Sequence, residues 1–212
     1  MTELRLRQVE GIGEAKARTI RESLGRAAGQ VEGELRRAEK LGAKLVCPDD
    51  ELYPAILRAI NDPPAVLYVL GELEPRDLNA MAIVGSRRCS HYGREQADRF
   101  AALLAGAGIT VVSGGARGID SAGHRGALRQ PAGRTIAVLG SGLDVPYPPE
   151  NVELFKMIAQ RGAVLSEFPL GTPPSAENFP RRNRIVSGMS RGVLVIEADA
   201  RSGAMITARL AG

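Results

Sequence analysis

Short apolar runs alternate with longer helical patterns from residue 80 onward. The runs are rich in Val, Ile and Leu and lack an alternating polar position, which is typical of strands buried on both faces of a parallel sheet. The predicted strands cover residues 80–84, 109–112, 135–139, 163–166 and 192–197. The helices predicted between them cover residues 93–107, 119–128, 150–160 and 181–190, and a last one begins near residue 203. This alternation predicts an α/β fold with a doubly wound, mainly parallel sheet.

The first 75 residues follow a different pattern. Residues 6–20 contain two helical segments joined by Gly11-Ile12-Gly13, which is typical of a helix-hairpin-helix (SAM-like) module. Such a turn can present helix amides to a phosphate, or the hairpin can serve packing alone, and the sequence leaves both interpretations open. A further helix is predicted over residues 31–42, with short strands at 44–47 and 65–70. Turn-rich residues 71–75 predict a boundary between a helical module of residues 1–75 and a domain of residues 76–212.

Composition and charge narrow the class of protein. The chain has 212 residues, of which 44% are hydrophobic, and this soluble, globular composition excludes disordered and collagen-like structure. No apolar stretch approaches the roughly 18 to 20 residues that cross a bilayer, and a signal peptide is not evident, so we expect a cytoplasmic protein. The net charge of +4 divides into −2 for residues 1–75 and +6 for the rest. A polyanionic partner is therefore expected at the second domain, although ordinary surface can carry the same charge.

Loops that follow the predicted strands carry candidate anion-binding chemistry. Glycine allows a close approach of the backbone, serine adds a hydroxyl donor, and arginine offers a planar fork that matches phosphate oxygens. The residues concerned are Gly85, Ser86 and Arg87 after the first strand, Gly114, Gly115 and Arg117 after the second, Gly140 to Gly142 after the third, and Arg201, Ser202 and Gly203 after the last. The spacing of a dinucleotide site and that of a Walker loop are both absent. Together the loops predict a phosphate cradle at the carboxyl edge of the sheet.

The connection after the fourth strand is too long for a plain crossover and ends in an aromatic and basic cluster. The cluster contains Phe179, Arg181, Arg182, Asn183 and Arg184, at the predicted start of a helix. An aromatic ring beside backbone-neutralising charge suits single-stranded nucleic acid. Phe179 can equally anchor the loop in the core. Cations at a helix start are unfavourable without an anion, which favours a binding role for the arginines.

Catalytic and metal-binding residues are not predicted. His124 follows Asp120 by four residues on a predicted helix, so the two side chains can pair, but no serine or cysteine lies in a nucleophile motif. A positioning role is therefore favoured for His124. Cys47 and Cys89 form no CxxC pair and are expected to be reduced, structural thiols. We expect no cofactor and no metal.

Several of these residues occur together in a pattern that resembles one family. The pattern comprises Gly85 to Arg87, Tyr92-Gly93, Val112 to Asp120 with His124 and residues 126–128, residues 136–140 with Gly142 to Asp144, Tyr147-Pro148, Ser166-Glu167, Phe179 to Ile185 and Ser202 to Ala204. It resembles the DNA processing protein A (DprA, or Smf) family over residues 79–211. Residues 50–54 and 62–64 extend the resemblance toward the N-terminus.

The resemblance implies a bacterial, cytoplasmic, non-enzymatic protein of natural transformation. Members of the family have a Rossmann-like domain behind a small helical domain, act as homodimers, protect incoming single-stranded DNA and help to load the RecA recombinase. The backbone pocket of the family maps onto Gly85, Ser86, Arg87, Gly114, Gly115, Arg117, Asn183, Arg184, Ser202 and Gly203. This set coincides with the cradle predicted from residue chemistry.

Two further expectations accompany the resemblance. Family members usually continue past the position of Gly212, so the sequence is expected to be a partial chain. The alternatives are a nucleotide-binding sensor that uses the same cradle, and a nucleotide hydrolase of the lysine-decarboxylase-like group. The hydrolase group uses a Pro-Gly-Gly-x-Gly-Thr-x-x-Glu loop, whereas residues 170–173 lack the glycines and the acid of that loop.

Overall fold

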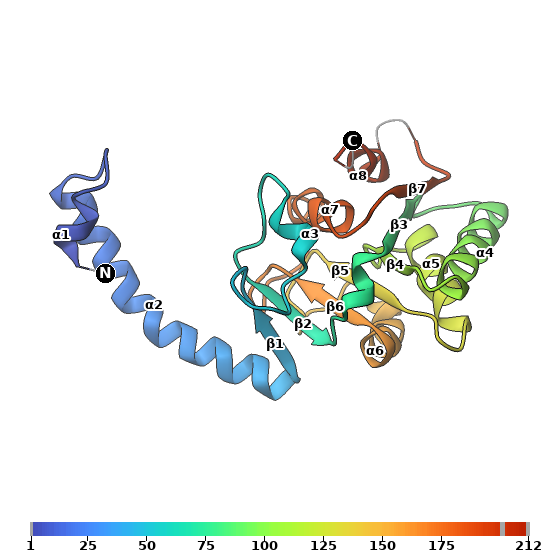
Figure 1. Cartoon of the computed structure of the whole chain (residues 1–212), viewed down its shortest axis with the longest axis horizontal. Helices are drawn as coiled ribbons and strands as arrows, with labels where there is room; N and C mark the ends of the chain where they lie inside the picture. The colour runs from blue at the N-terminus through green and yellow to red at the C-terminus, as the bar shows by residue number, and fades with distance from the viewer. Residues whose placement is uncertain (1, 200–201, 211–212) are drawn as a thin grey trace.

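A twisted sheet forms the centre of the molecule, seen in a computed structural model that describes residues 2–199 and 202–210 (Figure 1). Within these residues the sheet has seven strands, in the order β1-β2-β6-β5-β4-β3-β7. The strands are β1 (Ala43–Val46), β2 (Leu67–Gly71), β3 (Ala80–Gly85), β4 (Thr110–Ser113), β5 (Thr135–Leu139), β6 (Ala163–Ser166) and β7 (Val193–Ile196). Strands β3 to β7 are parallel, which confirms the predicted α/β fold with a mainly parallel, Rossmann-like sheet.

The two strands from the first 75 residues extend this sheet. Strand β1 pairs antiparallel with β2, and β2 pairs antiparallel with β6, where Tyr68 lies opposite Ser166. Residues 43–71 thus contribute directly to the main sheet, although they precede the predicted boundary. The division of the chain at residue 75 into two domains stays a prediction about folding units.

Helices cover both faces of the sheet. The described residues form α1 (Glu3–Leu6), α2 (Glu14–Leu41), α3 (Ala55–Arg58), α4 (His91–Gly106), α5 (Ile119–Arg129), α6 (Val152–Arg161), α7 (Asn178–Gly188) and α8 (Gly203–Arg209), with 3-10 turns η1 (Pro75–Leu78) and η2 (Pro149–Asn151). Helix α1 and most of α2 lie away from the sheet. Helix α4 begins two residues earlier than predicted because the Ser90 hydroxyl accepts a hydrogen bond from the Gly93 amide and caps it. Helix α7 begins at Asn178 rather than at Arg181, since Pro180 is tolerated in a first helical turn.

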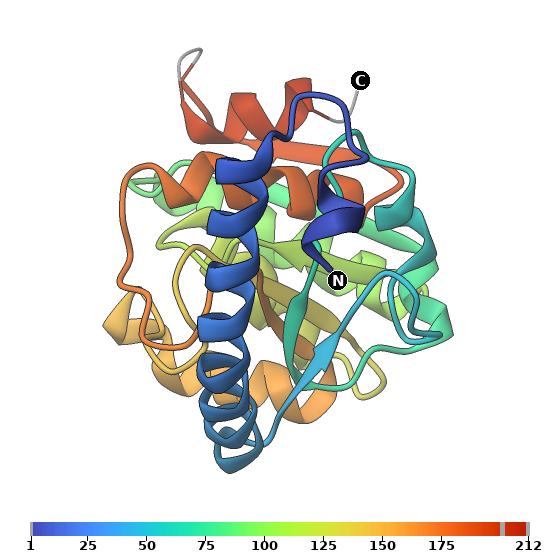
Figure 2. The same cartoon turned by 90° about the vertical axis from the view of Figure 1, so that its left-hand side faces the viewer.

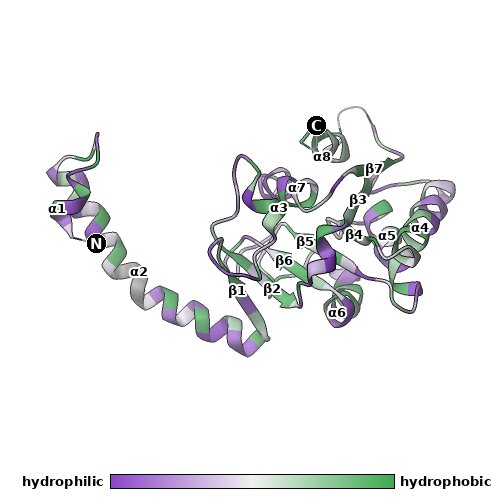
Figure 3. Cartoon of the chain, in the orientation of Figure 1, coloured by the Kyte–Doolittle hydropathy of each residue, from purple (hydrophilic) through white to green (hydrophobic). Residues whose placement is uncertain are grey.

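Alternate residues of each buried strand belong to different apolar clusters. In β5, Ile136 and Val138 pack in the cluster that includes α3, α7 and α8, whereas Ala137 and Leu139 pack in the cluster that includes α6. In β3, Ile83 packs with α4 and α5. Hydrophobic colouring accordingly concentrates on the strands and the inner sides of these helices (Figure 3). Burial on both faces explains why the strands show continuous apolar runs.

The N-terminal hairpin projects away from the sheet. Helix α2 runs outward from β1 and carries α1 at its far end (Figures 1 and 2). Gly11 has φ +80, as the predicted turn requires. The helix predicted over residues 31–42 is the last part of α2, which runs without a break from Glu14 to Leu41 and is capped by Gly42 at φ +74. The near end of α2 is attached by Arg37, which pairs with Asp144 at 2.9 Å, and by Glu34, which accepts from the Leu170 amide at 2.7 Å. The part of α2 beyond these contacts is largely exposed.

Two general expectations can be compared with this fold. Cys47 and Cys89 are both free thiols, with Cys47 exposed and Cys89 half-buried. The exposure of Cys47 does not support the structural role expected for it. Of the helices in the described ranges, none combines the length and the apolar character that a bilayer crossing demands.

Candidate anion-binding site

A pocket of about 750 Å³ lies at the carboxyl edge of the parallel strands. The chain leaves β3 toward β4 on one side and returns as β7 on the other, so the loops after these strands diverge and leave a crevice. Nine of the thirteen predicted site residues line the pocket, namely Gly85, Ser86, Arg87, Gly114, Phe179, Arg182, Asn183, Ser202 and Gly203. The other four, Gly115, Arg117, Arg181 and Arg184, lie around it. Arg201 of the last predicted loop lies outside the described residues.

The loop after β3 presents an exposed cation to the pocket. The Ser86 amide donates to the Glu197 carbonyl at 2.8 Å, which ties this loop to the end of β7. The Arg87 guanidinium lies over the Phe179 ring, with its carbon 4.8 Å from the ring centroid. In the described part of the chain Arg87 has no carboxylate partner. Its charge is therefore available to an anion.

At the glycines of the loop after β4, the space that a side chain would need is filled by other protein atoms and not left open for a ligand. A Cβ at residue 114 would lie 2.6 Å from the Arg182 guanidinium, and one at residue 115 would lie 2.5 Å from the Phe155 ring. Gly118 has φ +75 and ψ −122, a conformation essentially confined to glycine, and it lies directly against the Ser86 carbonyl. These three glycines let the loop pack tightly, so their role is to shape the pocket. Gly203 differs, since the nearest atom to its Cβ position is 3.9 Å away.

Arg182 is a buried cation beneath this loop. Its Nη1 donates to the carbonyl of Gly114 at 2.5 Å and to that of Val138, and its side chain is only 4% exposed. Burial lowers its pKa to about 10, and the nearby Asp120 carboxylate opposes this shift. Burial likewise raises the pKa of Asp120, whose carboxylate accepts from the Ala116 amide. Arg182 therefore joins the ends of β4 and β5 and adds positive charge to the pocket floor.

Arg184 points away from the pocket, into a clamp of two carboxylates. Its guanidinium contacts Asp62 at 2.9 Å and Glu167 at 2.5 Å. Burial lowers the pKa of Arg184, but the hydrogen bonds that its guanidinium donates to Asp62 and Glu167 outweigh that effect and the net shift is upward. The clamp joins the segment before β2 to the loop after β6. This geometry favours a positioning role over direct anion binding.

The remaining two predicted arginines flank the pocket. Arg117 pairs with Glu150 through both its Nε and its Nη2, donates to the Tyr147 hydroxyl at 3.3 Å, and is half exposed. The hydrogen bonds from Glu150 raise the pKa of Arg117, and the same contact lowers that of Glu150. Arg181 is exposed and lies 5.7 Å from the centroid of the Phe168 ring. An anion that binds Arg117 has to compete with Glu150.

Polar groups of α7 and α8 complete the rim. The Asn183 amide donates to the Gly203 carbonyl at 3.3 Å. Ser202 is the residue before the first turn of α8, and its hydroxyl is a buried polar atom without a partner in the described part of the chain. Asn183 and Ser202 both line the pocket, so an anion there has side-chain donors within the wall.

An apolar wall faces these polar groups. Phe179 and Tyr147 form a tilted aromatic pair with centroids 5.9 Å apart, and Pro174, Pro180 and Ile206 line the same pocket. The Phe179 side chain is half-buried, so part of its ring packs against the protein and part remains exposed. The pocket thus combines apolar surface with cationic and hydrogen-bonding groups.

The structure also decides how His124 is used. His124 is fully buried, and its Nδ1 forms a hydrogen bond with the Thr135 hydroxyl at 2.7 Å. The possible pair with Asp120 is replaced by this bond. Burial lowers the pKa of His124 to about 3, so the imidazole is neutral near pH 7. This placement agrees with a positioning role. The described residues contain no group of three His, Cys, Asp or Glu side chains that could hold a metal.

Sequence reasoning missed the residues that the loop after β5 brings to the site. Tyr147 lines the pocket, and Glu150 holds Arg117. The Asn151 amide donates to the Gly115 carbonyl at 2.9 Å and to the Ser121 hydroxyl at 2.8 Å, which braces the loop after β4. A signal was present, because these polar and aromatic residues follow a buried strand at the same edge of the sheet.

Comparison with known proteins gives consistent matches. The family model described as DNA recombination-mediator protein A matches residues 44–212. Protein Smf of Escherichia coli strain K12 is 47% identical over 182 residues, which are 85% of this chain and 48% of that protein. The chain spans about half the length of the curated relatives it matches.

Two solved structures are similar to this fold. The X-ray structure of DNA processing protein A from Streptococcus pneumoniae has a TM-score of 0.75 and 41% identity, covering 80% of this chain and 59% of that one. DNA processing protein A from Helicobacter pylori, whose structure concerns its single-stranded DNA binding mode, has a TM-score of 0.69 and 34% identity, covering 79% of this chain and 76% of that one.

Proposed function

The chain belongs to the DNA recombination-mediator protein A family, and from this premise we propose that it binds single-stranded DNA during DNA processing in natural transformation. In this proposal the protein captures the phosphate backbone, shields the strand, and carries out no bond chemistry. The family match and the single-stranded DNA binding mode described for the Helicobacter pylori protein support the nucleic acid as ligand. Loading of RecA and formation of a homodimer are part of the same proposal, through the family resemblance.

One observation carries the proposal. The exposed Arg87 guanidinium, without a carboxylate partner in the described residues, lies 4.8 Å from the centre of a half-buried aromatic ring inside a pocket with an apolar wall. A phosphate can pair with the cation while a base contacts the apolar wall, which is how single strands are bound without sequence preference. A cradle for a free phosphate would gain nothing from Tyr147 and Phe179.

The predicted residues take two kinds of role in this proposal. Those expected to contact DNA lie in the lining of the pocket or beside it: Ser86, Arg87, Arg117, Phe179, Arg181, Asn183, Ser202 and Gly203. Arg117 would have to exchange its contact with Glu150 for one with a phosphate. Those expected to support the site hold the loops in place: Gly85, Gly114, Gly115, Arg182 and Arg184. Contact residues should affect DNA affinity directly, and support residues should affect it through stability.

Fluorescence anisotropy of a labelled oligo-dT over a salt series tests the proposal. We expect salt-sensitive binding that unlabelled single strands displace and that duplex DNA and a mononucleotide do not. Arg87→Ala should weaken binding at all sequences and lower the salt slope by about 0.7, the value for one single-strand phosphate contact. Displacement by a mononucleotide would instead favour a nucleotide sensor, and release of a base would indicate a hydrolase. Absence of binding would contradict the proposal.

A further inference from the structure

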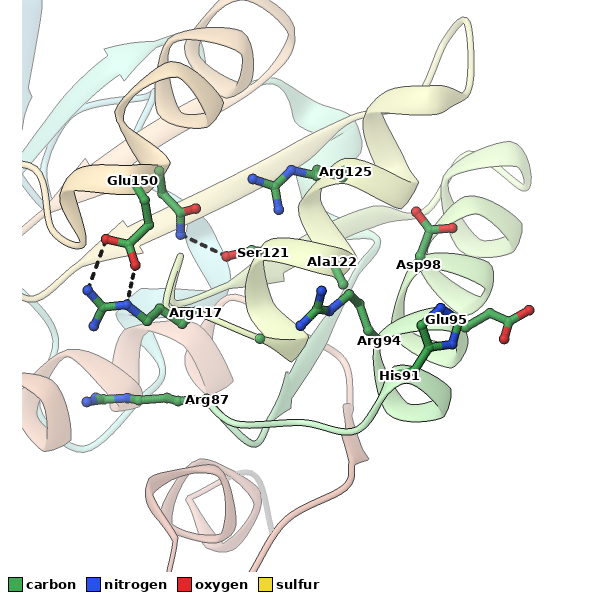
Figure 4. A pocket seen from close by; sticks show the side chains of 12 residues that line it. Arg87, His91, Arg94, Glu95, Asp98, Arg117, Ser121, Ala122, Arg125 and Glu150 are labelled. Atoms are coloured by element: carbon green, nitrogen blue, oxygen red, sulfur yellow. Dashed lines mark hydrogen bonds and ion pairs between the residues drawn. The ribbon is translucent and has the colours of Figure 1, made fainter.

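A second hollow adjoins the cradle on the outer side of helices α4 and α5. It has a volume of about 700 Å³ and is bounded by residues of α4, of α5 and of the 3-10 turn η2 (Figure 4). Arg87 lines both this hollow, called here the α4–α5 groove, and the cradle. The two hollows therefore meet at Arg87.

Two arginines in the α4–α5 groove lack any carboxylate partner within residues 2–199 and 202–210. Arg94 extends from α4 and Arg125 from α5 toward the hollow, and both side chains are exposed (Figure 4). Neither guanidinium forms a hydrogen bond or ion pair among these residues. Together with Arg87, whose guanidinium points away from theirs in Figure 4, they give the lining of this hollow three guanidinium groups without a carboxylate partner in the described residues.

The carboxylates of the groove do not neutralise the charges of Arg87, Arg94 and Arg125. Asp98 pairs with Arg129, which lies outside the lining, and Glu150 pairs with Arg117. The Glu95 carboxylate points out of the hollow, away from Arg94 and Arg125 (Figure 4). Like charges gathered on two facing helices repel one another, and a bound anion converts this repulsion into attraction.

We propose that the α4–α5 groove binds the phosphates of the same single strand as it leaves the cradle. This inference rests on the proposed function and adds a second contact region, with Arg94 and Arg125 as its phosphate ligands. The groove differs from the cradle in that its lining, among the described residues, contains no Phe, Tyr or Trp, and His91 is its one aromatic side chain. It therefore contacts the backbone, while the bases face solvent. A strand that reaches from one region to the other contacts Arg87 between them.

Oligonucleotide length separates the two regions in an experiment. A short oligo-dT of about 5 nucleotides fills the cradle alone, and one of about 30 nucleotides also reaches the groove. The double variant Arg94→Ala with Arg125→Ala should bind the long oligonucleotide on the order of tenfold more weakly at low salt. Its salt slope should fall by about 1.4, or 0.7 for each lost contact. Affinity for the short oligonucleotide should stay at the wild-type value.

Arg99→Ala is the matched control, since Arg99 is an exposed arginine of α4 outside the lining of the groove. It should leave the affinity and slope for both lengths near the wild-type values. Equal losses for short and long oligonucleotides, or no loss with the long one, would overturn the groove while leaving the cradle intact. If Arg99→Ala lowers the affinity for the long oligonucleotide as much as the double variant does, the effect comes from the net charge of the protein, and the proposed groove is overturned too. Absence of wild-type binding to either length would overturn both the groove and the proposed function.

Discussion

Arg87 and Arg182 both line the same pocket and illustrate two uses of one residue type. Arg87 is exposed, contacts the face of Phe179 and has no carboxylate partner in the described residues, whereas Arg182 is buried and bonded to two backbone carbonyls. Burial makes the difference, since a desolvated guanidinium must satisfy its donors within the protein. An arginine in a binding motif can therefore either contact the ligand or hold the surrounding loops in place. Its burial and its hydrogen-bond partners determine which of the two roles it has.

Loss of Arg182 should produce the largest effect. Arg182→Ala leaves the carbonyls of Gly114 and Val138 without their donor and opens a cavity beneath the loop after β4. We expect the free energy of unfolding to fall by about 3 kcal/mol or more, measured by urea denaturation. Arg181→Ala, at the next position of α7 but exposed, should change it by less than about 0.5 kcal/mol. A change in the free energy of unfolding that is equally small in both variants would show that Arg182 does not hold the loop after β4 in place.

Arg184 tests the distinction between an arginine that contacts the ligand and one that supports the surrounding structure. Arg184→Ala leaves the buried Glu167 carboxylate without its cation, and we expect a stability loss of about 2 kcal/mol, since Asp62 is exposed and contributes little. The salt slope of DNA binding by the folded variant should stay at its wild-type value. A slope lower by about 0.7, with stability unchanged, would instead identify Arg184 as a direct phosphate ligand.

Phe179 distinguishes stacking from core anchoring. Phe179→Ala should weaken binding of oligo-dT by about 1 to 3 kcal/mol if a base stacks on the ring. Because Arg87 lies over the same ring, the variant also frees the guanidinium from its aromatic contact. Phe100→Ala, at a partly exposed position on α4, serves as control for loss of a ring. A loss of thermal stability with intact affinity would support the anchoring interpretation.

His124 gives the smallest effect and extends the comparison to a cation that burial neutralises. Unlike Arg182, His124 has no carbonyl acceptor among the described residues that would stabilise its charged form. Burial lowers the pKa of His124 to about 3 in the folded protein, whereas its pKa in the unfolded chain is near 6.5. The unfolded state thus binds more protons, so stability falls as the pH drops below 6.5. Between pH 6.5 and 5.5 we expect a loss of about 1 kcal/mol that His124→Asn abolishes. His91→Asn, at an exposed site, should retain the loss, and an unchanged profile in His124→Asn would contradict the assignment.

Much of the fold could be predicted because buried parallel strands leave a strong local signal. Predicted strands over residues 135–139 and 163–166 agree with the structure at both ends; the strand predicted over 65–70 begins two residues too early, and the others shift by one residue at each end or less. The pairing of β2 with β6 could not be predicted, since it depends on contacts between residues nearly 100 positions apart in sequence. The start of α7 was also missed, because Pro180 hides a helix start that the local pattern places later.

For the site, the residue types that reach the carboxyl edge could be predicted from the sequence, because connections in a parallel sheet place the loops after successive strands together. The sequence could not determine which of them face a ligand. Gly114 packs against Arg182, Arg184 enters the clamp of Asp62 and Glu167, and Arg87 stays exposed. Only the tertiary structure decided these roles, since the partners of a charge come from distant segments, and desolvation depends on all of them at once.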